Sequence, residues 1–292
     1  MENLDAPNAD STSAISKVYG QSNTGLASWI LPEDKIPIFL TFSIYSFPIK
    51  HLEGYYLFSF NSRVALWINR ESKVIIVGLK GTSSSTKEQD LSDDLLIMTD
   101  KNYCGSLSIC DDATKLLDEY NSSIPVVTDT VVIGVNEIIP YKIIFVGHSL
   151  GGTGALCMVP KYENSRAISI NGGAPPTNPT RTGPGPSLAT HYHIVGDLIS
   201  SHMYPQAARV IRVKLPGMTF GSLAPHNGDN VFKEGKYYTA DEEDQEYRTW
   251  GYGKNLIYSV VSRLLWLNTF AVNAQVAWIV YKHPIPGSSR DY

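Results

Sequence analysis

Cysteine is scarce in this chain of 292 residues, which has only Cys104, Cys110 and Cys157. Three cysteines cannot all pair within one chain, so the count argues against a disulfide framework and favours a reducing compartment. A single bridge between Cys104 and Cys110 stays open as an alternative. Residues 1–16 lack the charged-then-apolar pattern of a signal peptide, so we expect a loose N-terminal tail there and an intracellular protein.

Charge is also sparse, because Asp, Glu, Lys and Arg make up 18% of the chain and the formal net charge is −4. Lysine and arginine form no cluster of the kind that follows a phosphate backbone. We therefore expect no nucleic acid among the partners of this protein.

The strongest apolar segment, residues 256–281 between Leu256 and Tyr281, falls short of a clear membrane span because Arg263 and several amides interrupt it. We expect one or two helices packed on the rest of the protein, with a helix on a membrane surface or across a membrane as alternatives. The predicted organisation is one large domain over residues 17–255 and an apolar helical extension over residues 256–292.

Apolar runs and helical segments follow one another in the middle of the chain. Imperfect alternation predicts an antiparallel strand at residues 55–68, and the β-branched run Val74–Leu79 is typical of a strand covered on both faces. A helix is expected at residues 113–120. Further strands are expected at residues 131–133, 141–146, 167–170, 191–195 and 210–215. This order favours an open α/β sheet with ligands at the carboxyl ends of its strands.

The most informative motif is Gly147-His148-Ser149-Leu150-Gly151, a G-x-S-x-G pattern. It follows the apolar run at residues 143–146 and precedes a segment rich in small residues, so the context is strand, tight turn and helix. Such a turn holds the serine in a strained conformation, which requires glycines beside it, and the helix N-terminus favours negative charge. We interpret Ser149 as a nucleophile; the alternative is a glycine-rich turn that happens to contain a serine.

A nucleophilic serine needs a histidine to take its proton and a carboxylate to orient that histidine. In hydrolases built around such an elbow, the acid and then the histidine follow the serine along the chain. Asp197 is the candidate acid, because it follows the expected strand at residues 191–195 through Gly196. A turn aspartate is the alternative interpretation.

Three histidines follow Asp197, and His226 is the preferred base. His226 lies in a loop after the strand that ends near Leu215, whereas His202 is only five residues beyond the acid. His283, which follows the apolar segment, is the alternative base. An ordinary surface histidine is the other interpretation of either residue.

An oxyanion hole needs two fixed N–H donors. The residue after the nucleophile, Leu150, supplies one backbone N–H in such sites. We expect the second from Thr82, in the loop that follows the strand Val74–Leu79; its hydroxyl is a further candidate donor.

Taken together, these motifs resemble the class 3 lipases, the fungal triacylglycerol lipase type. The matching stretches are Leu79-Lys80-Gly81-Thr82, Asp90-Leu91-Ser92-Asp93-Asp94-Leu95, Gly147 to Gly152, Asn171-Gly172-Gly173-Ala174-Pro175, His193 to Ile199 and His226 to Phe232. Lys80 and Leu91 depart from the usual arginine and tryptophan. Residues 83–89 are polar where a fungal lid has an apolar face, so the resemblance does not extend to activation by such a lid.

The resemblance implies an α/β-hydrolase fold, with a mostly parallel central sheet flanked by helices. It implies a serine hydrolase of lipid esters, a triacylglycerol lipase or a phospholipase or lysophospholipase, that forms an acyl-enzyme on Ser149. No metal or organic cofactor is implied, and the implied partner is a lipid ester. Residues 256–281 match no part of the resemblance, and contact of this segment with a membrane surface is the alternative to packing on the rest of the protein. The alternatives are a catalytically inactive lipase-like protein with a structural or membrane-binding role, and an acyltransferase that uses the same nucleophile.

Overall fold

A computed structural model of the protein describes residues 25–82, 90, 92–94, 97, 103–123, 141–173, 188–197, 200, 208–218, 224–246 and 248. The chain divides into two compact units, Met1–Thr239 and Ala240–Tyr292, and the described residues of the second unit are helical. The predicted tail at residues 1–16, the predicted strand at 131–133 and the predicted extension at 256–292 lie outside the described residues. These three stay predictions.

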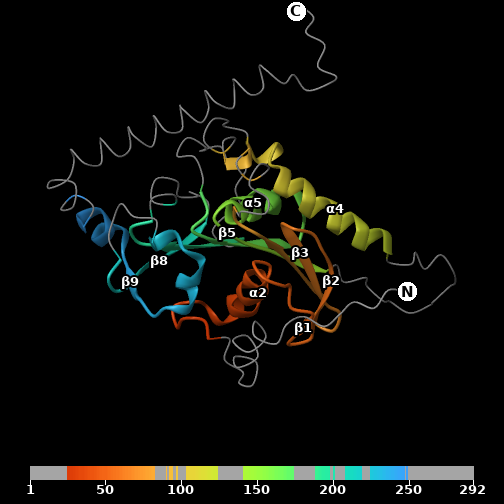
Figure 1. Cartoon of the computed structure of the whole chain (residues 1–292), viewed down its shortest axis with the longest axis horizontal. Coiled ribbons are helices and arrows are strands. Elements are labelled where there is room, and N and C mark those ends of the chain that lie inside the picture. The colour runs from red at the N-terminus through yellow and green to blue at the C-terminus, as the bar shows by residue number, and fades with distance from the viewer. Residues whose placement is uncertain are drawn as a thin grey trace, which may run out of the picture. The chain divides into compact units, whose positions relative to one another are not determined.

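Within the described residues, nine strands form one sheet, in the order in which they follow along the chain (Figure 1). They are β1 (His51–Leu52), β2 (Tyr55–Phe60), β3 (Val64–Asn69), β4 (Val74–Leu79), β5 (Lys142–His148), β6 (Ser165–Ile170), β7 (Ala189–Ile194), β8 (Arg209–Lys214) and β9 (Lys236–Tyr238). Strands β4 to β8 run parallel, whereas β1 to β4 pair antiparallel and β9 pairs antiparallel with β8. The sheet is therefore mixed rather than mostly parallel, because antiparallel strands extend its parallel centre at both edges.

The single strand predicted at residues 55–68 is wrong, because two antiparallel strands, β2 and β3, occupy this stretch. Asn61 makes the turn between them: its side-chain oxygen accepts the backbone N–H groups of Arg63 and Val64, each at 2.8 Å. Asparagine favours turns because its side chain offers the backbone such bonds in place of a strand ladder. The other predicted strands within the described residues agree with β4 to β8 to within two residues.

Helices cover both faces of the sheet (Figure 1). Helices α4 (Ser108–Ser123) and α5 (Leu150–Met158) pack on one face, and α2 (Pro32–Ser43) packs on the other. Crossovers between parallel strands are right-handed, and β5 and β6 are added to the sheet in the same direction, so the helices that precede them, α4 and α5, lie on the same face. Helix α4 contains the predicted helix at residues 113–120 and extends beyond it at both ends.

Strand β4 shows how the two halves of the core form. Ile75, Val77 and Leu79 belong to the apolar cluster beneath α4 and α5, whereas Ile76 belongs to the cluster beneath α2. All four side chains are buried. Burying each stabilises the fold by about 1.5–3 kcal/mol, and alternate strand residues point to opposite faces. The predicted coverage of this strand on both faces is confirmed.

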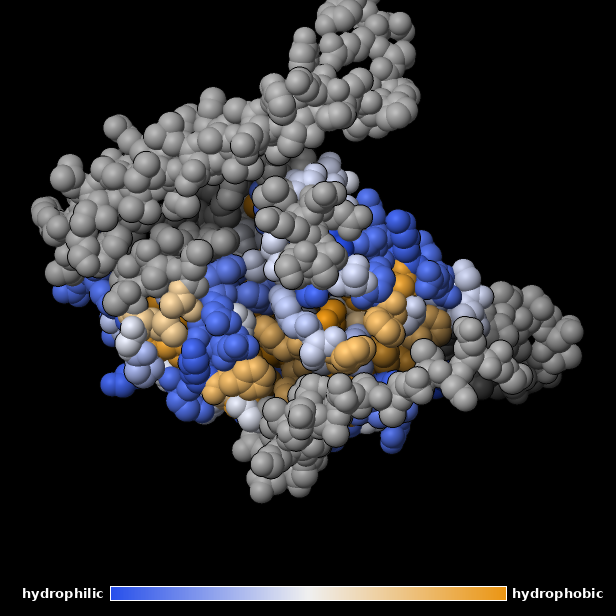
Figure 2. All heavy atoms as spheres, viewed as in Figure 1, coloured by the Kyte–Doolittle hydropathy of each residue, from blue (hydrophilic) through white to orange (hydrophobic). Residues whose placement is uncertain are grey.

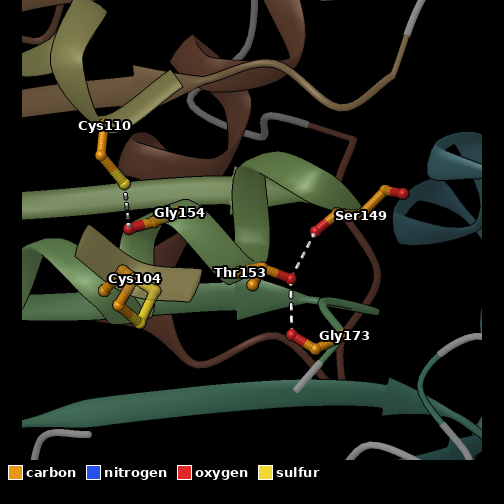
Figure 3. The surroundings of a disulfide bond; sticks show 7 residues. Cys104, Cys110, Ser149, Thr153, Gly154 and Gly173 are labelled. Carbon is orange, nitrogen blue, oxygen red and sulfur yellow. Dashed lines mark hydrogen bonds between the residues drawn. A yellow bond between two sulfur atoms is a disulfide. The ribbon is translucent and has the colours of Figure 1, made fainter. Parts of the chain in front are cut away.

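One disulfide bond corrects the expectation from cysteine counting. Cys104, in the 3₁₀ helix η1 (Tyr103–Gly105), is bonded to Cys157 of α5 (Figure 3). Cys110 is instead a free, buried thiol on α4 that lies 3.8 Å from the carbonyl oxygen of Gly154. Cys110 is close to Cys104 in sequence, but η1 packs on α5, and this packing places Cys157 next to Cys104. The bond removes the cysteine-based argument for a reducing compartment.

The visible surface has a polar and an apolar part. Hydrophilic residues cover the outer side of α4, whereas hydrophobic residues gather around α2 (Figure 2). Helix α4 is amphipathic, with a buried row that includes Ile109, Ala113, Leu116 and Tyr120. In the part of the chain that the structure describes, every helix is too short or too polar to cross a lipid bilayer.

Candidate active site

Ser149 lies at a sharp turn between β5, which ends at His148, and α5, which begins at Leu150. Its backbone has φ 56° and ψ −125°, a conformation that is costly for any residue with a side chain. A Cβ on Gly147 would clash with the backbone of Gly151, and one on Gly151 would clash with the backbone of Leu79. The predicted strained elbow, with glycines required on either side, is confirmed.

Three predicted residues meet at the carboxyl ends of the parallel strands. Ser149 Oγ lies 2.7 Å from His226 Nε2, and His226 Nδ1 lies 3.0 Å from Asp197 Oδ2 and 3.1 Å from Oδ1. Because a carboxylate only accepts hydrogen bonds, Nδ1 carries the ring proton and Nε2 is left to accept the proton of the serine hydroxyl. This is the geometry in which a histidine can activate a serine.

Each of the three side chains is placed by a different element. Asp197 follows β7 through Gly196, whose φ of 95° turns the chain, and its side chain is fully buried. His226 ends the 3₁₀ helix η3 (Ala224–His226), which follows β8, and its side chain is 15% exposed. The other base candidates, His202 and His283, lie outside the described residues. Among the described candidates, the structure brings His226 to the serine.

The predicted oxyanion segment, residues 79–82, runs beside Ser149. A Cβ on Gly81 would lie 3.1 Å from the Cβ of Ser149, so the chain after β4 passes close to the serine. The N–H of Leu150 belongs to the first turn of α5, where backbone N–H groups have no partner within their own helix. The hydroxyl of Thr82 donates to Asp94 at 2.9 Å. This bond holds Thr82 in place, and Thr82 is the residue whose backbone N–H we predict as the second oxyanion donor.

Three aspartates that follow this segment in the chain, Asp90, Asp93 and Asp94, form hydrogen bonds or ion pairs with Thr82 or Arg63. Burial raises the pKa of the Asp94 carboxyl, and the hydrogen bond from Thr82 opposes that rise. Asp90 and Asp93 pair with the buried Arg63 at 3.0 and 2.6 Å. Among the residues that the structure describes, no group of three or more His, Cys, Asp and Glu side chains is placed to hold a metal ion.

Tyr45 and His148 also belong to the site, and sequence reasoning missed both. The backbone N–H of Gly81 donates to the Tyr45 hydroxyl at 2.7 Å, and this hydroxyl lies 3.3 Å from His148 Nδ1. His148 Nε2 lies 2.7 Å from the backbone carbonyl oxygen of His226. Since a carbonyl only accepts, Nε2 carries the proton of the neutral ring and Nδ1 accepts from the tyrosine.

This chain of bonds links Gly81, in the predicted oxyanion segment, to the backbone of His226 through Tyr45 and His148. Burial lowers the pKa of His148 to about 4, so the ring stays neutral near pH 7 and keeps this pattern. The position of His148 inside the elbow motif could have identified it as a site residue. Its partner, Tyr45, follows α2, a helix that was not predicted from the sequence.

Aromatic side chains line the site on the α2 side. The ring of Phe42 lies 5.8 Å from the ring of His148, 5.9 Å from that of Tyr45 and 6.5 Å from that of Phe232, between ring centroids. Tyr45 is 39% exposed and Phe232 is 42% exposed. These three aromatic residues, Phe42, Tyr45 and Phe232, form an apolar wall that reaches solvent beside the candidate catalytic residues.

Comparison with known proteins adds little. No protein-family model matches the chain, and no curated protein matches it. Among solved structures, the chain is similar to the Lip2 lipase from Yarrowia lipolytica, at 15% identity over 72% of this chain and 80% of that chain, with a TM-score of 0.36. A likeness this distant assigns no role to any residue.

Proposed function

We propose that this protein is a serine hydrolase that cleaves carboxylic esters of lipids, such as glycerides or phospholipids, through an acyl-enzyme on Ser149. The observation that carries the proposal is the continuous set of contacts from Ser149 Oγ to His226 Nε2 at 2.7 Å, and from His226 Nδ1 to Asp197 Oδ2 at 3.0 Å. A nucleophile, a base within reach of it and a carboxylate that orients the base are the groups that acyl transfer needs.

In this mechanism Ser149 Oγ attacks the ester carbonyl while His226 Nε2 takes the hydroxyl proton. The N–H groups of Leu150 and Thr82 hold the oxyanion of the tetrahedral intermediate, and Asp197 stabilises the imidazolium. His226 then gives its proton to the leaving alcohol, which leaves the acyl group on Ser149. A water molecule that His226 activates releases the acid in the second half of the reaction.

Two features support a lipid rather than a small polar ester. The wall of Phe42, Tyr45 and Phe232 offers apolar surface beside the nucleophile, where an acyl chain or an apolar alcohol would lie. The ordered motifs that resemble those of class 3 lipases point the same way. Contact of residues 256–281 with a membrane surface remains part of this proposal.

Hydrolysis of a short-chain and a long-chain p-nitrophenyl ester, together with labelling by a fluorophosphonate, tests the proposal. We expect the wild type to hydrolyse both esters and to be labelled, because a fluorophosphonate reacts with an activated serine. Ser149→Ala should abolish labelling and lower the rate by about 10⁴-fold or more. Ser122→Ala, which changes an exposed serine on α4, is the matched control and should behave as the wild type.

Two results would contradict the proposal. Equal rates for the wild type and Ser149→Ala would show that Ser149 is not the nucleophile. A wild type that neither turns over esters nor reacts with the fluorophosphonate would favour the alternative of a lipase-like protein without activity.

A further inference from the structure

A second buried chain of hydrogen bonds reaches Asp197 in addition to the contact with His226. The Ser200 hydroxyl donates to Asp197 Oδ2 at 2.6 Å, and His193 Nδ1 lies 2.7 Å from the same hydroxyl oxygen. Ser200, His193 and Asp197 are all fully buried, so neither Ser200 nor His193 can touch a substrate. From this geometry we propose that Ser200 and His193 are positioning residues that hold the carboxylate of Asp197 in place for His226; the inference rests on the proposed function.

The direction of each bond follows from the donors available. A serine hydroxyl has one proton, and the Asp197 carboxylate can only accept it. The oxygen of Ser200 must therefore accept from His193, so His193 carries a proton on Nδ1. The result is one directed chain from His193 Nδ1–H to Ser200 and from Ser200 O–H to Asp197, which also accepts the Nδ1–H of His226.

The contact with His226 alone leaves the orientation of the carboxylate poorly defined. His226 Nδ1 is almost equally distant from the two oxygens of Asp197, at 3.0 and 3.1 Å. The shorter bond from Ser200 reaches only Oδ2, so it distinguishes the two oxygens and opposes rotation of the group. Hydrogen bonds to a carboxylate are stronger than neutral ones, and small errors in the position of a catalytic group are costly to the rate.

The same strand provides an internal control for simple packing. His191, two residues before His193 on β7, is also fully buried, and its Nδ1 lies 3.0 Å from the hydroxyl of the buried Ser169 on β6. Both pairs consist of a buried histidine and a buried serine in hydrogen-bond contact. They differ in that Ser200 also donates to Asp197, whereas the contact of the Ser169 hydroxyl is with the ring of His191. A role confined to packing would make Ser169 and Ser200 equivalent, whereas a positioning role separates them.

The kinetic test compares Ser200→Ala with Ser169→Ala on a p-nitrophenyl ester. We expect Ser200→Ala to lower kcat about tenfold with KM unchanged, and Ser169→Ala to keep the wild-type kcat. His193→Leu, which removes the donor to Ser200, should lower kcat about threefold, and His193→Asn, whose side-chain amide replaces Nδ1–H, should restore it. If Ser200→Ala does not fold, the two His193 variants decide the question.

A second measurement does not depend on ester hydrolysis. Proton NMR of the free protein detects the His226 Nδ1–H, which is protected from exchange while a fixed carboxylate accepts it. We expect this signal in the wild type, Ser169→Ala and His193→Asn, and its loss through faster exchange in Ser200→Ala.

The proposal is overturned if Ser200→Ala keeps both the wild-type kcat and the His226 signal, or if Ser169→Ala loses as much of each as Ser200→Ala does. An inactive wild type would count against the proposed function, and the NMR comparison would still decide whether Ser200 positions Asp197.

Discussion

The Arg63 cluster, made of Arg63, Asp90, Asp93 and Asp112, and the site around Ser149 are built from similar parts. Each places at least one buried carboxylate against a nitrogen-bearing side chain, and in the Arg63 cluster Asp90 and Asp93 are buried whereas Asp112 is partly exposed. Arg63 is almost fully buried and lies within 3.3 Å of a carboxylate oxygen of each of the three aspartates. Asp197 is likewise fully buried, and it faces the His226 ring at 3.0 Å.

The two regions differ in what the nitrogen-bearing group can do. A guanidinium stays charged at any ordinary pH and only donates, so it cannot take a proton from a neighbour. An imidazole bound to a carboxylate through one nitrogen keeps the other as an acceptor, and here that nitrogen faces a hydroxyl. Burial and charge are therefore common to both regions; what distinguishes the site proposed as catalytic is a titratable ring directed at a serine hydroxyl.

The largest expected effect is on the rate of ester hydrolysis, and it distinguishes Asp197 from the aspartates of the Arg63 cluster. Asp197→Asn should lower kcat/KM for an ester by about 10⁴-fold, because an amide favours the wrong tautomer of His226. Asp112→Asn makes the same change in the Arg63 cluster and should leave kcat/KM within about twofold, since Arg63 keeps Asp90 and Asp93. Steady-state kinetics measure both variants. Similar losses of kcat/KM in the two variants would show that Asp197 has no role in the reaction beyond that of the structural aspartate Asp112.

The next effect is on stability rather than on catalysis. Arg63→Met should lower the free energy of unfolding by about 3–5 kcal/mol, because it leaves the buried carboxylates of Asp90 and Asp93 without their cation. Arg70→Met removes an exposed arginine and should cost about 1 kcal/mol or less. Urea unfolding followed by circular dichroism measures the difference. Equal midpoints for the two variants would contradict the structural role of the Arg63 cluster.

The last effect concerns the pH dependence of stability. Burial lowers the pKa of His191 to about 3 and that of His148 to about 4. Below about pH 6.5 each ring takes up a proton when the protein unfolds, so stability present at neutral pH falls as the pH is lowered towards 4. Each histidine contributes up to about 1.4 kcal/mol per pH unit to this fall.

His191→Asn removes one of these titrating groups. The free energy of unfolding of this variant, measured in urea at several values between pH 7 and pH 4, should depend less steeply on pH than that of the wild type. A slope equal to that of the wild type would show that His191 is not buried as a neutral ring.

Much of the site could be predicted because its signals are local. Ser149 is marked by its glycines, since a turn this tight excludes side chains at Gly147 and Gly151. Asp197 is marked by the strand that ends just before it, and His226 by the loop that follows β8. The parallel strands were predictable because strands buried on both faces read as apolar runs.

The errors arise where the backbone follows side-chain contacts rather than periodicity. The hairpin between β2 and β3 depends on bonds from the side chain of Asn61, which an alternating pattern does not reveal. Helix α2 contains Pro37 in its interior, so its sequence gives little sign of a helix, and the site residue Tyr45 was missed with it. The Cys104–Cys157 bond joins segments 53 residues apart.

The sequence by itself determined the elbow, the order of the candidate catalytic residues and the strands of the parallel sheet, because these depend on steric limits and burial patterns within a few neighbouring residues. Only the tertiary structure decided that His226 is the described histidine that reaches Ser149, that Cys157 is the partner of Cys104, and that Tyr45 and Ser200 contact the site. The reason is physical: a hydrogen bond or a disulfide forms between groups that the fold brings within about 3 Å or less of each other, whatever their separation along the chain.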